Sequence, residues 1–195
     1  MKKKFELTEN YVVNEFGTKL YQIKCIKTFK SAIKGELGGY IEKEENLSQE
    51  GNAWVYGNAR VYDNARVYGN AQVYDNAKVS NNAQVRAAAR VYGNAQVYGA
   101  ARVYSNARVY DNARVYGNAQ VRAAARVYGN AQVYDNAKVS NNALVSGNAL
   151  VSGNAWVYGN AQVYGAARVF DSAWVYGKAQ VYDDALVYGD TKVCK

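Results

Sequence analysis

Residues 89–112 read ARVYGN AQVYGA ARVYSN ARVYDN, which is one six-residue unit written four times. The unit continues in both directions: valine occupies every sixth position from Val55 to Val193, giving 24 consecutive hexads without an insertion or deletion. Alanine stands two residues before each valine from Ala53 to Ala185, and only Thr191 breaks this second column. A repeat of this length indicates an array of identical structural units.

The hexad favours short strands joined by corners. In an extended chain residues two apart share a face, so Ala-x-Val turns alanine and valine to one side and their neighbours to the other. Gly-Asn or Asp-Asn, which usually follow, tolerate positive φ and let the chain turn every six residues. A six-residue period drifts off the face of a helix. Three strands and three corners close a coil of 18 residues, so the hexads predict an all-β parallel solenoid of about eight coils.

Composition narrows the class of protein. The 195 residues contain no proline and no histidine, and the charge is +8. Residues 51–195 hold 15 Lys and Arg against 8 Asp, whereas residues 1–50 are nearly balanced, so the repeats carry the positive charge. No stretch approaches the length of an apolar membrane helix, and no apolar signal core follows the basic N-terminus. We therefore expect a cytoplasmic protein that does not enter the membrane, and we expect free thiols at Cys25 and Cys194.

Residues 1–50 have a different pattern. Phe16-Gly17-Thr18 separates the apolar residues 11–13 from the alternating residues 20–26, which suggests a β-hairpin. A hairpin here would cover strand edges that otherwise invite pairing. We divide the chain into an N-terminal β-hairpin cap, 1–50, and a hexapeptide-repeat β-helix, 51–195.

Two patterns carry a family resemblance. The hexad Val-Tyr-Gly-Asn-Ala-x resembles the hexapeptide repeat of left-handed β-helix proteins, although tyrosine stands where that family usually has small or acidic residues. Residues 25–29, 34–41, 46–48 and 50–55 resemble the start of YdcK-like proteins. Periodicity alone leaves the handedness open, and the resemblance implies a left-handed coil. It also implies a transferase activity.

The residues themselves favour a structural role over catalysis. Related acyltransferases use a histidine base, and zinc enzymes of this fold use three histidines, so a chain without histidine has neither site. The Asp residues replace glycine at corner positions, which indicates turn formation. The adjacent carboxylates Asp183-Asp184 are explained as charge on the terminal coil that discourages strand pairing at its edge. No residue near Cys194 in the sequence can act as a base that would activate its thiol. We predict no catalytic residue, no metal site and no cofactor.

Outward positions form a basic and aromatic surface. Residues 18 apart should stack on neighbouring strands, which aligns Arg-Val-Tyr units into columns. Basic groups interleaved with aromatic rings suit a polyanion such as a nucleic acid, nucleotide or polysaccharide. The alternative is structural, with tyrosine rings supporting one another across strands. Residues 59–73 recur as 107–121, a shift that moves side chains to another face and favours the structural alternative. The candidate anion-binding residues are Arg90, Tyr92, Arg108, Tyr110, Arg126 and Tyr128.

Apolar residues replace Arg and Gln at outward positions of the last coils, which suggests a contact surface. We therefore expect a homo-oligomer, with a trimer of parallel rods as one form. The preferred function is a non-catalytic scaffold that self-associates and presents its Tyr/Arg faces; the alternatives are a binder of anionic ligands and an acyltransferase-like protein. The candidate self-association residues are Leu150, Trp156, Trp174 and Leu186.

Overall fold

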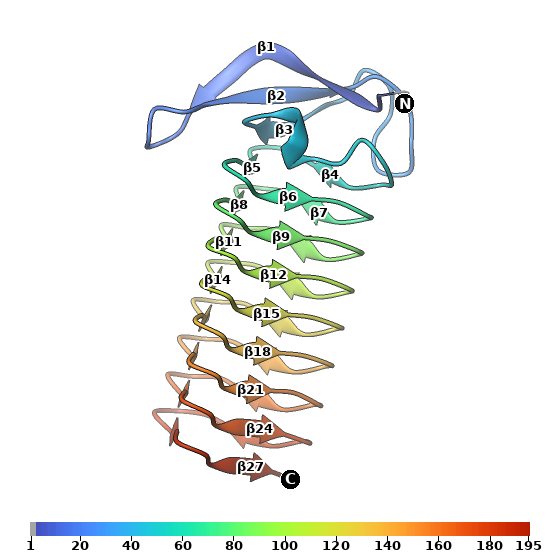
Figure 1. The fold of residues 1–195 in the computed structure, drawn as a ribbon. Coiled ribbons are helices and arrows are strands. Elements are labelled where there is room, and N and C mark those ends of the chain that lie inside the picture. The colour runs from blue at the N-terminus through green and yellow to red at the C-terminus, as the bar shows by residue number, and fades with distance from the viewer. Residues whose placement is uncertain (1–2) are drawn as a thin grey trace.

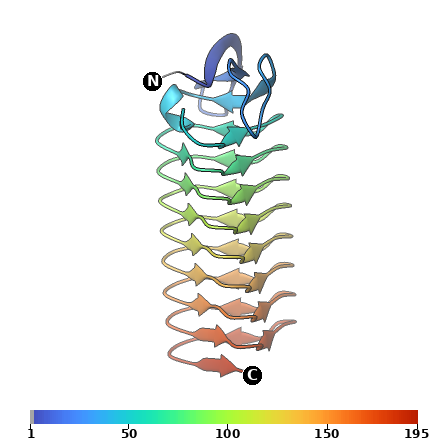
Figure 2. The same cartoon turned by 90° about the vertical axis from the view of Figure 1, so that its right-hand side faces the viewer.

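A computed structural model describes residues 3–195 as a parallel β-solenoid of stacked coils beneath an N-terminal hairpin (Figure 1). Three sheets form the walls of the rod. Sheet I has eleven strands and sheets II and III have eight each. The N-terminus lies at the hairpin end and the C-terminus at the opposite end (Figure 2). No helix among the described residues has the length and apolar character to span a bilayer.

The strands follow one another around the three sheets in turn. Sheet I contains β1 (Phe5–Val13), β2 (Lys19–Cys25), β3 (Leu37–Ile41), β5 (Arg60–Val61), β8 (Lys78–Val79), β11 (Gln96–Val97), β14 (Arg114–Val115), β17 (Gln132–Val133), β20 (Leu150–Val151), β23 (Arg168–Val169) and β26 (Leu186–Val187). Sheet II contains β4 (Trp54–Val55), β7 (Gln72–Val73), β10 (Arg90–Val91), β13 (Arg108–Val109), β16 (Arg126–Val127), β19 (Leu144–Val145), β22 (Gln162–Val163) and β25 (Gln180–Val181). Sheet III contains β6 (Arg66–Val67), β9 (Gln84–Val85), β12 (Arg102–Val103), β15 (Gln120–Val121), β18 (Lys138–Val139), β21 (Trp156–Val157), β24 (Trp174–Tyr176) and β27 (Lys192–Cys194).

The register confirms the hexad interpretation. Each valine pairs in parallel with the valine 18 residues away, as Val91 does with Val109. Every column valine from Val55 to Val175 is fully buried, and Val181 and Val187 are nearly so. In Figure 1 the chain descends from N to C while the near strands of sheet III run from left to right, which is a left-handed coil.

Corners are made by residues in the left-handed backbone region. All 24 corner positions from Gly51 to Gly189 have φ between 53° and 74°. Glycine, aspartate and asparagine reach this region easily, but Ala87 and Ala123 adopt it with a Cβ that disfavours it. The expectation that the repeat aspartates form corners is confirmed at Asp63 and at its counterparts in later coils.

The coil begins earlier than the hexads indicate. Strands β1 and β2 form an antiparallel hairpin, and β3 pairs with β2 on one side and with β5 on the other. Ile41 thereby enters the valine column beside Val61, and Leu47 bridges to Val67. These pairs are 20 residues apart rather than 18, because two extra residues lie between Leu47 and Val55. Residue 50 therefore marks the start of the unbroken hexads and not the start of the coil. A short 3₁₀ helix, η1 (Glu44–Asn46), lies in this first turn.

The cap lies close on the first coil. A Cβ on Gly38 would stand 2.6 Å from the Val55 carbonyl oxygen, and one on Gly39 would stand 2.7 Å from that of Ala59, so both positions require glycine. Tyr62 follows Val61 at an outward position of the hexad and is nevertheless only 5% exposed.

Candidate functional site

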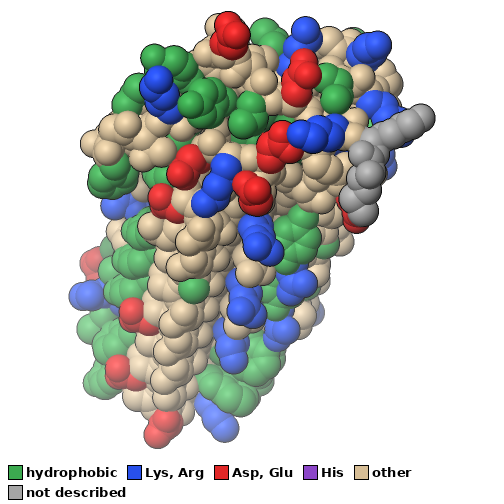
Figure 3. All heavy atoms as spheres, turned by 45° about the horizontal axis from the view of Figure 1, so that its top comes forward, with side chains coloured by type: hydrophobic (Ala, Val, Ile, Leu, Met, Phe, Trp, Pro, Cys, Tyr) green, Lys and Arg blue, Asp and Glu red, His purple; other side chains and the backbone are tan. Residues whose placement is uncertain are grey.

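The predicted arginine column exists on sheet II. Arg90 pairs with Arg108, and Arg108 with Arg126, on the adjacent strands β10, β13 and β16. All three side chains are exposed. The ion pairs within residues 3–195 are Lys3–Glu44 and Lys78–Glu15, so these arginines have no carboxylate partner there. Figure 3 shows basic side chains gathering beside hydrophobic ones along the rod.

Tyrosines stack beside these arginines. The ring centroids of Tyr74 and Tyr92 are 4.7 Å apart, and those of Tyr92, Tyr110 and Tyr128 follow at 4.9 Å, with interplanar angles of 4° or less. Burial of its ring raises the pKa of Tyr110 above the ordinary value of a phenol. The structure thus places the six candidate anion-binding residues together on sheet II, and the stacking of their tyrosine rings is the arrangement that the structural alternative expects.

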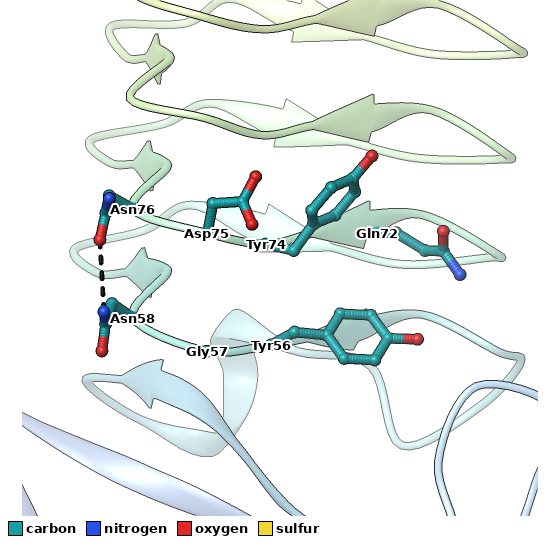
Figure 4. A pocket seen from close by; sticks show the side chains of 7 residues that line it. All are labelled: Tyr56, Gly57, Asn58, Gln72, Tyr74, Asp75 and Asn76. Atoms are coloured by element: carbon teal, nitrogen blue, oxygen red, sulfur yellow. Dashed lines mark hydrogen bonds between the residues drawn. The ribbon is translucent and has the colours of Figure 1, made fainter.

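The tyrosine column of sheet II ends at the cap. The hydroxyl of Tyr56 donates to the Ser31 carbonyl oxygen at 2.8 Å, and its ring stands at 87° to Tyr74. A hollow of about 660 Å³ lies beside this perpendicular pair, with Gln72 and Asp75 among its lining residues (Figure 4). The carboxylate of Asp75 accepts from the amide of Gly93 at 3.0 Å, so one of its oxygens is already bound.

Sheet I carries a second column. Tyr98, Tyr116 and Tyr134 stack at 4.9 and 5.0 Å, and Phe170 stacks on Tyr188 at 5.5 Å with 14° between the planes. Between these two stacks stands Ser152, which supplies no ring. The gap forms a hollow of about 330 Å³.

Serine interrupts the tyrosine columns at other places as well. Ser140 on sheet III accepts a hydrogen bond of 3.0 Å from Nε1 of Trp156, so an aromatic side chain of the same face reaches that serine. Ser80 on sheet I lies beside the tip of the hairpin, in a hollow that Glu15 and Phe16 also line. Ser146 on sheet II is half-buried. Serine in a tyrosine column was the available sequence signal for these hollows.

The four candidate self-association residues do not form one surface. Trp156 and Trp174 are neighbours on sheet III, with ring centroids 5.6 Å apart. Leu150 and Leu186 lie on sheet I, on strands separated by β23. The expected single flank is therefore wrong in its geometry, because residues 150 and 156 are one hexad apart and one hexad moves the chain to the next sheet.

The tryptophans are also engaged within the chain. The ammonium of Lys138 lies 5.9 Å from the ring centroid of Trp156, and that of Lys192 lies 5.1 Å from that of Trp174. Such cation–π contacts hold both rings partly covered.

Corner side chains link coil to coil. Asn112 donates to Asn130 and accepts from Asn94, each at 3.2 Å, within a ladder of corner asparagines. Corner aspartates accept from the corner amide of the next coil, as Asp111 does from Gly129 at 3.2 Å. These carboxylates therefore act as hydrogen-bond acceptors for backbone amides. Both cysteines are free thiols, as expected. Within residues 3–195 no group of three or more potential metal ligands comes together.

Comparison with known proteins supports the architecture. The family described as the YdcK beta solenoid repeat matches residues 53–69, 59–72, 71–86, 89–106, 107–122, 131–146, 143–159, 161–177 and 179–194. An Escherichia coli (strain K12) protein named uncharacterized acetyltransferase YdcK is 41% identical over 61 residues. That match covers 28% of this chain and 19% of the relative, so it spans about a fifth of the relative's length. On the repeat matches across residues 53–194, the chain belongs to the YdcK β-solenoid repeat family.

Proposed function

We propose that this protein is a non-catalytic scaffold that self-associates and presents its Tyr/Arg faces to partners. One observation carries the proposal: the outward tyrosines and the corner acids are already engaged within the chain. Tyr92 stacks on rings above and below, and corner acids such as Asp111 bind backbone amides. Side chains that are held by such contacts make the surface rigid and keep its shape constant along the rod.

The tryptophan pair on sheet III supports self-association. Trp156 and Trp174 are partly exposed neighbours, and paired aromatic rings are frequent anchors in protein interfaces. Native mass spectrometry of the purified protein should therefore report an oligomer. Replacing Trp156 and Trp174 together by Gln should give a folded monomer.

Leu150 and Leu186 supply the matched control, since they lie on a different sheet. Replacing both leucines by Gln should leave the oligomer intact if sheet III is the contact surface. A wild-type protein that sediments as a monomer at high micromolar concentration would end the self-association proposal, and an oligomer that only the leucine variant dissociates would move the interface to sheet I.

Binding of a polyanion is a second candidate, favoured by the exposed and unpaired column of Arg90, Arg108 and Arg126. Replacing all three by Gln should weaken binding of single-stranded DNA and flatten its salt dependence, because fewer counterions are released. A control with the same charge change, Arg66, Arg102 and Arg114 to Gln, removes arginines from sheets I and III. Equal effects of the two triple variants would show that binding depends on the total charge of the protein and not on the column of Arg90, Arg108 and Arg126.

A transferase function rests on the name of the E. coli relative. Acyl transfer needs a general base near the acceptor, and this chain offers no histidine. We expect no steady acetyl-coenzyme A turnover with amine or sugar acceptors. Turnover that one point substitution abolishes would replace the scaffold proposal.

A further inference from the structure

We propose that the empty rung at Ser152 is a binding site for a small aromatic anion whose ring carries an N–H or O–H donor. The site goes beyond the scaffold function and needs no part of it. It lies on sheet I, whereas the proposed contact surface lies on sheet III.

The size of the site follows from the column itself. Tyr134 ends one stack and Phe170 begins the next, with Ser152 on the strand between them. Successive rings in the upper stack are 4.9–5.0 Å apart, so two rungs separate the facing rings by about 10 Å. A planar ring inserted midway would lie about 5 Å from each neighbour and would continue the stack. Both rings line the hollow of about 330 Å³.

A donor on the ring is indicated by the serine. Ser152 is 8% exposed, and its hydroxyl makes no hydrogen bond to another group of residues 3–195. At the equivalent Ser140, the indole N–H of Trp156 donates to the hydroxyl at 3.0 Å. The protein thus already satisfies one column serine with an aromatic N–H, and Ser152 lacks that partner.

The charge of the ligand follows from the walls. Leu150 and Leu186 provide apolar sides, and the exposed Arg168 between them is the cation among the lining residues. The two carboxylates in the lining face the corner: Asp135 accepts from the amide of Gly153 and Asp171 from that of Gly189, each at 3.1 Å. Each lining carboxylate is thus already bound to a corner amide, whereas the guanidinium of Arg168 has no carboxylate partner among residues 3–195 and is free to pair with a carboxylate or phosphate on the ring.

Indole-3-acetate is a suitable probe, because it combines an indole N–H with a carboxylate, and 3-methylindole is its uncharged analogue. Saturation-transfer NMR and calorimetric titration of the full chain should show binding of the acid at one site. Arg168→Gln should weaken the acid about five- to tenfold and leave 3-methylindole unchanged.

Ser152→Tyr is the decisive variant. Tyrosine is the residue of this column at positions 98, 116 and 134, so the substitution fills the rung with a side chain that the coil already accepts. It should abolish binding and raise the melting temperature. Ser146→Tyr makes the same change on sheet II, where Tyr128 and Tyr164 flank the serine but Gln162 stands in place of Arg168. It should leave the affinity for the acid within twofold. Wild-type protein that fails to bind either indole at millimolar concentration would overturn the proposal. So would binding retained by Ser152→Tyr, or lost in Ser146→Tyr instead.

Discussion

Val109→Ala tests whether the narrow valine prism supplies the stability of the rod. Val109 is fully buried on β13, with Val91 above and Val127 below it in register. Removing two methyl groups forfeits about 1.6 kcal/mol of transfer free energy at about 0.8 kcal/mol for each buried carbon. Backbone hydrogen bonds hold the neighbouring coils at fixed spacing, so the site cannot collapse and the cavity raises the cost to about 2–3 kcal/mol.

Equilibrium urea unfolding, followed by circular dichroism, should measure this loss. Val187→Ala is the matched control: Val187 is 7% exposed near the end of the rod, so the same deletion should cost about 1 kcal/mol. A solenoid sums the stability of its coils and of their interfaces, so the central variant should also broaden the transition. Equal losses at positions 109 and 187, or a central loss below about 0.5 kcal/mol, would refute the rigid-prism reasoning.

Three further changes test other features. Burial lowers the pKa of Lys4 to about 8, so below pH 8 the full cost of burying its charge is present. From pH 8 to 10.5 the unfolded chain binds more protons at this site, and stability should rise, by about 1–2 kcal/mol after solvent screening, relative to Lys4→Met at each pH. Ala123→Gly should raise stability by about 0.5–1 kcal/mol, since φ is 58° there and glycine removes the Cβ conflict, although it adds backbone entropy to the unfolded chain; a lower melting temperature would contradict this. Asn112→Ala should cost about 1 kcal/mol in urea unfolding by breaking two ladder bonds, and no measurable loss would show that water replaces them.

The repeat region was predictable because one period governs both the core and the corners. Val109 and Ala107 are buried as the spacing requires, and corner residues such as Asp111 adopt positive φ. The first turn was not predictable, because the two extra residues before Val55 shift Ile41 out of the sixfold register. Its place in the column depends on pairing with β5, which is a long-range contact.

The candidate site was predictable only in part. Residues 18 apart fall on one sheet, so the column of Arg90 and Arg108 follows from counting. The hollows depend on which way a ring turns. Tyr56 leaves its stack because Ser31 of the cap accepts its hydroxyl, and no local pattern contains that contact. The prediction that the two tryptophans and the two leucines form one contact surface was wrong, because their positions were compared along the chain and not within each sheet.

Each hexad spans one wall of the rod, so the number of preceding hexads decides which wall carries the outward side chains of a given hexad. Inserting one hexad after Asn118 would keep every following valine in the core and every corner at a corner. All later outward side chains would move by a third of a turn, so Arg126 would leave the wall that carries Arg90 and Arg108. Three inserted hexads would restore the alignment and only lengthen the rod. Duplication of one or two hexads can therefore move part of a surface pattern to another sheet, and duplication of three can extend it, while the packing of the core stays the same.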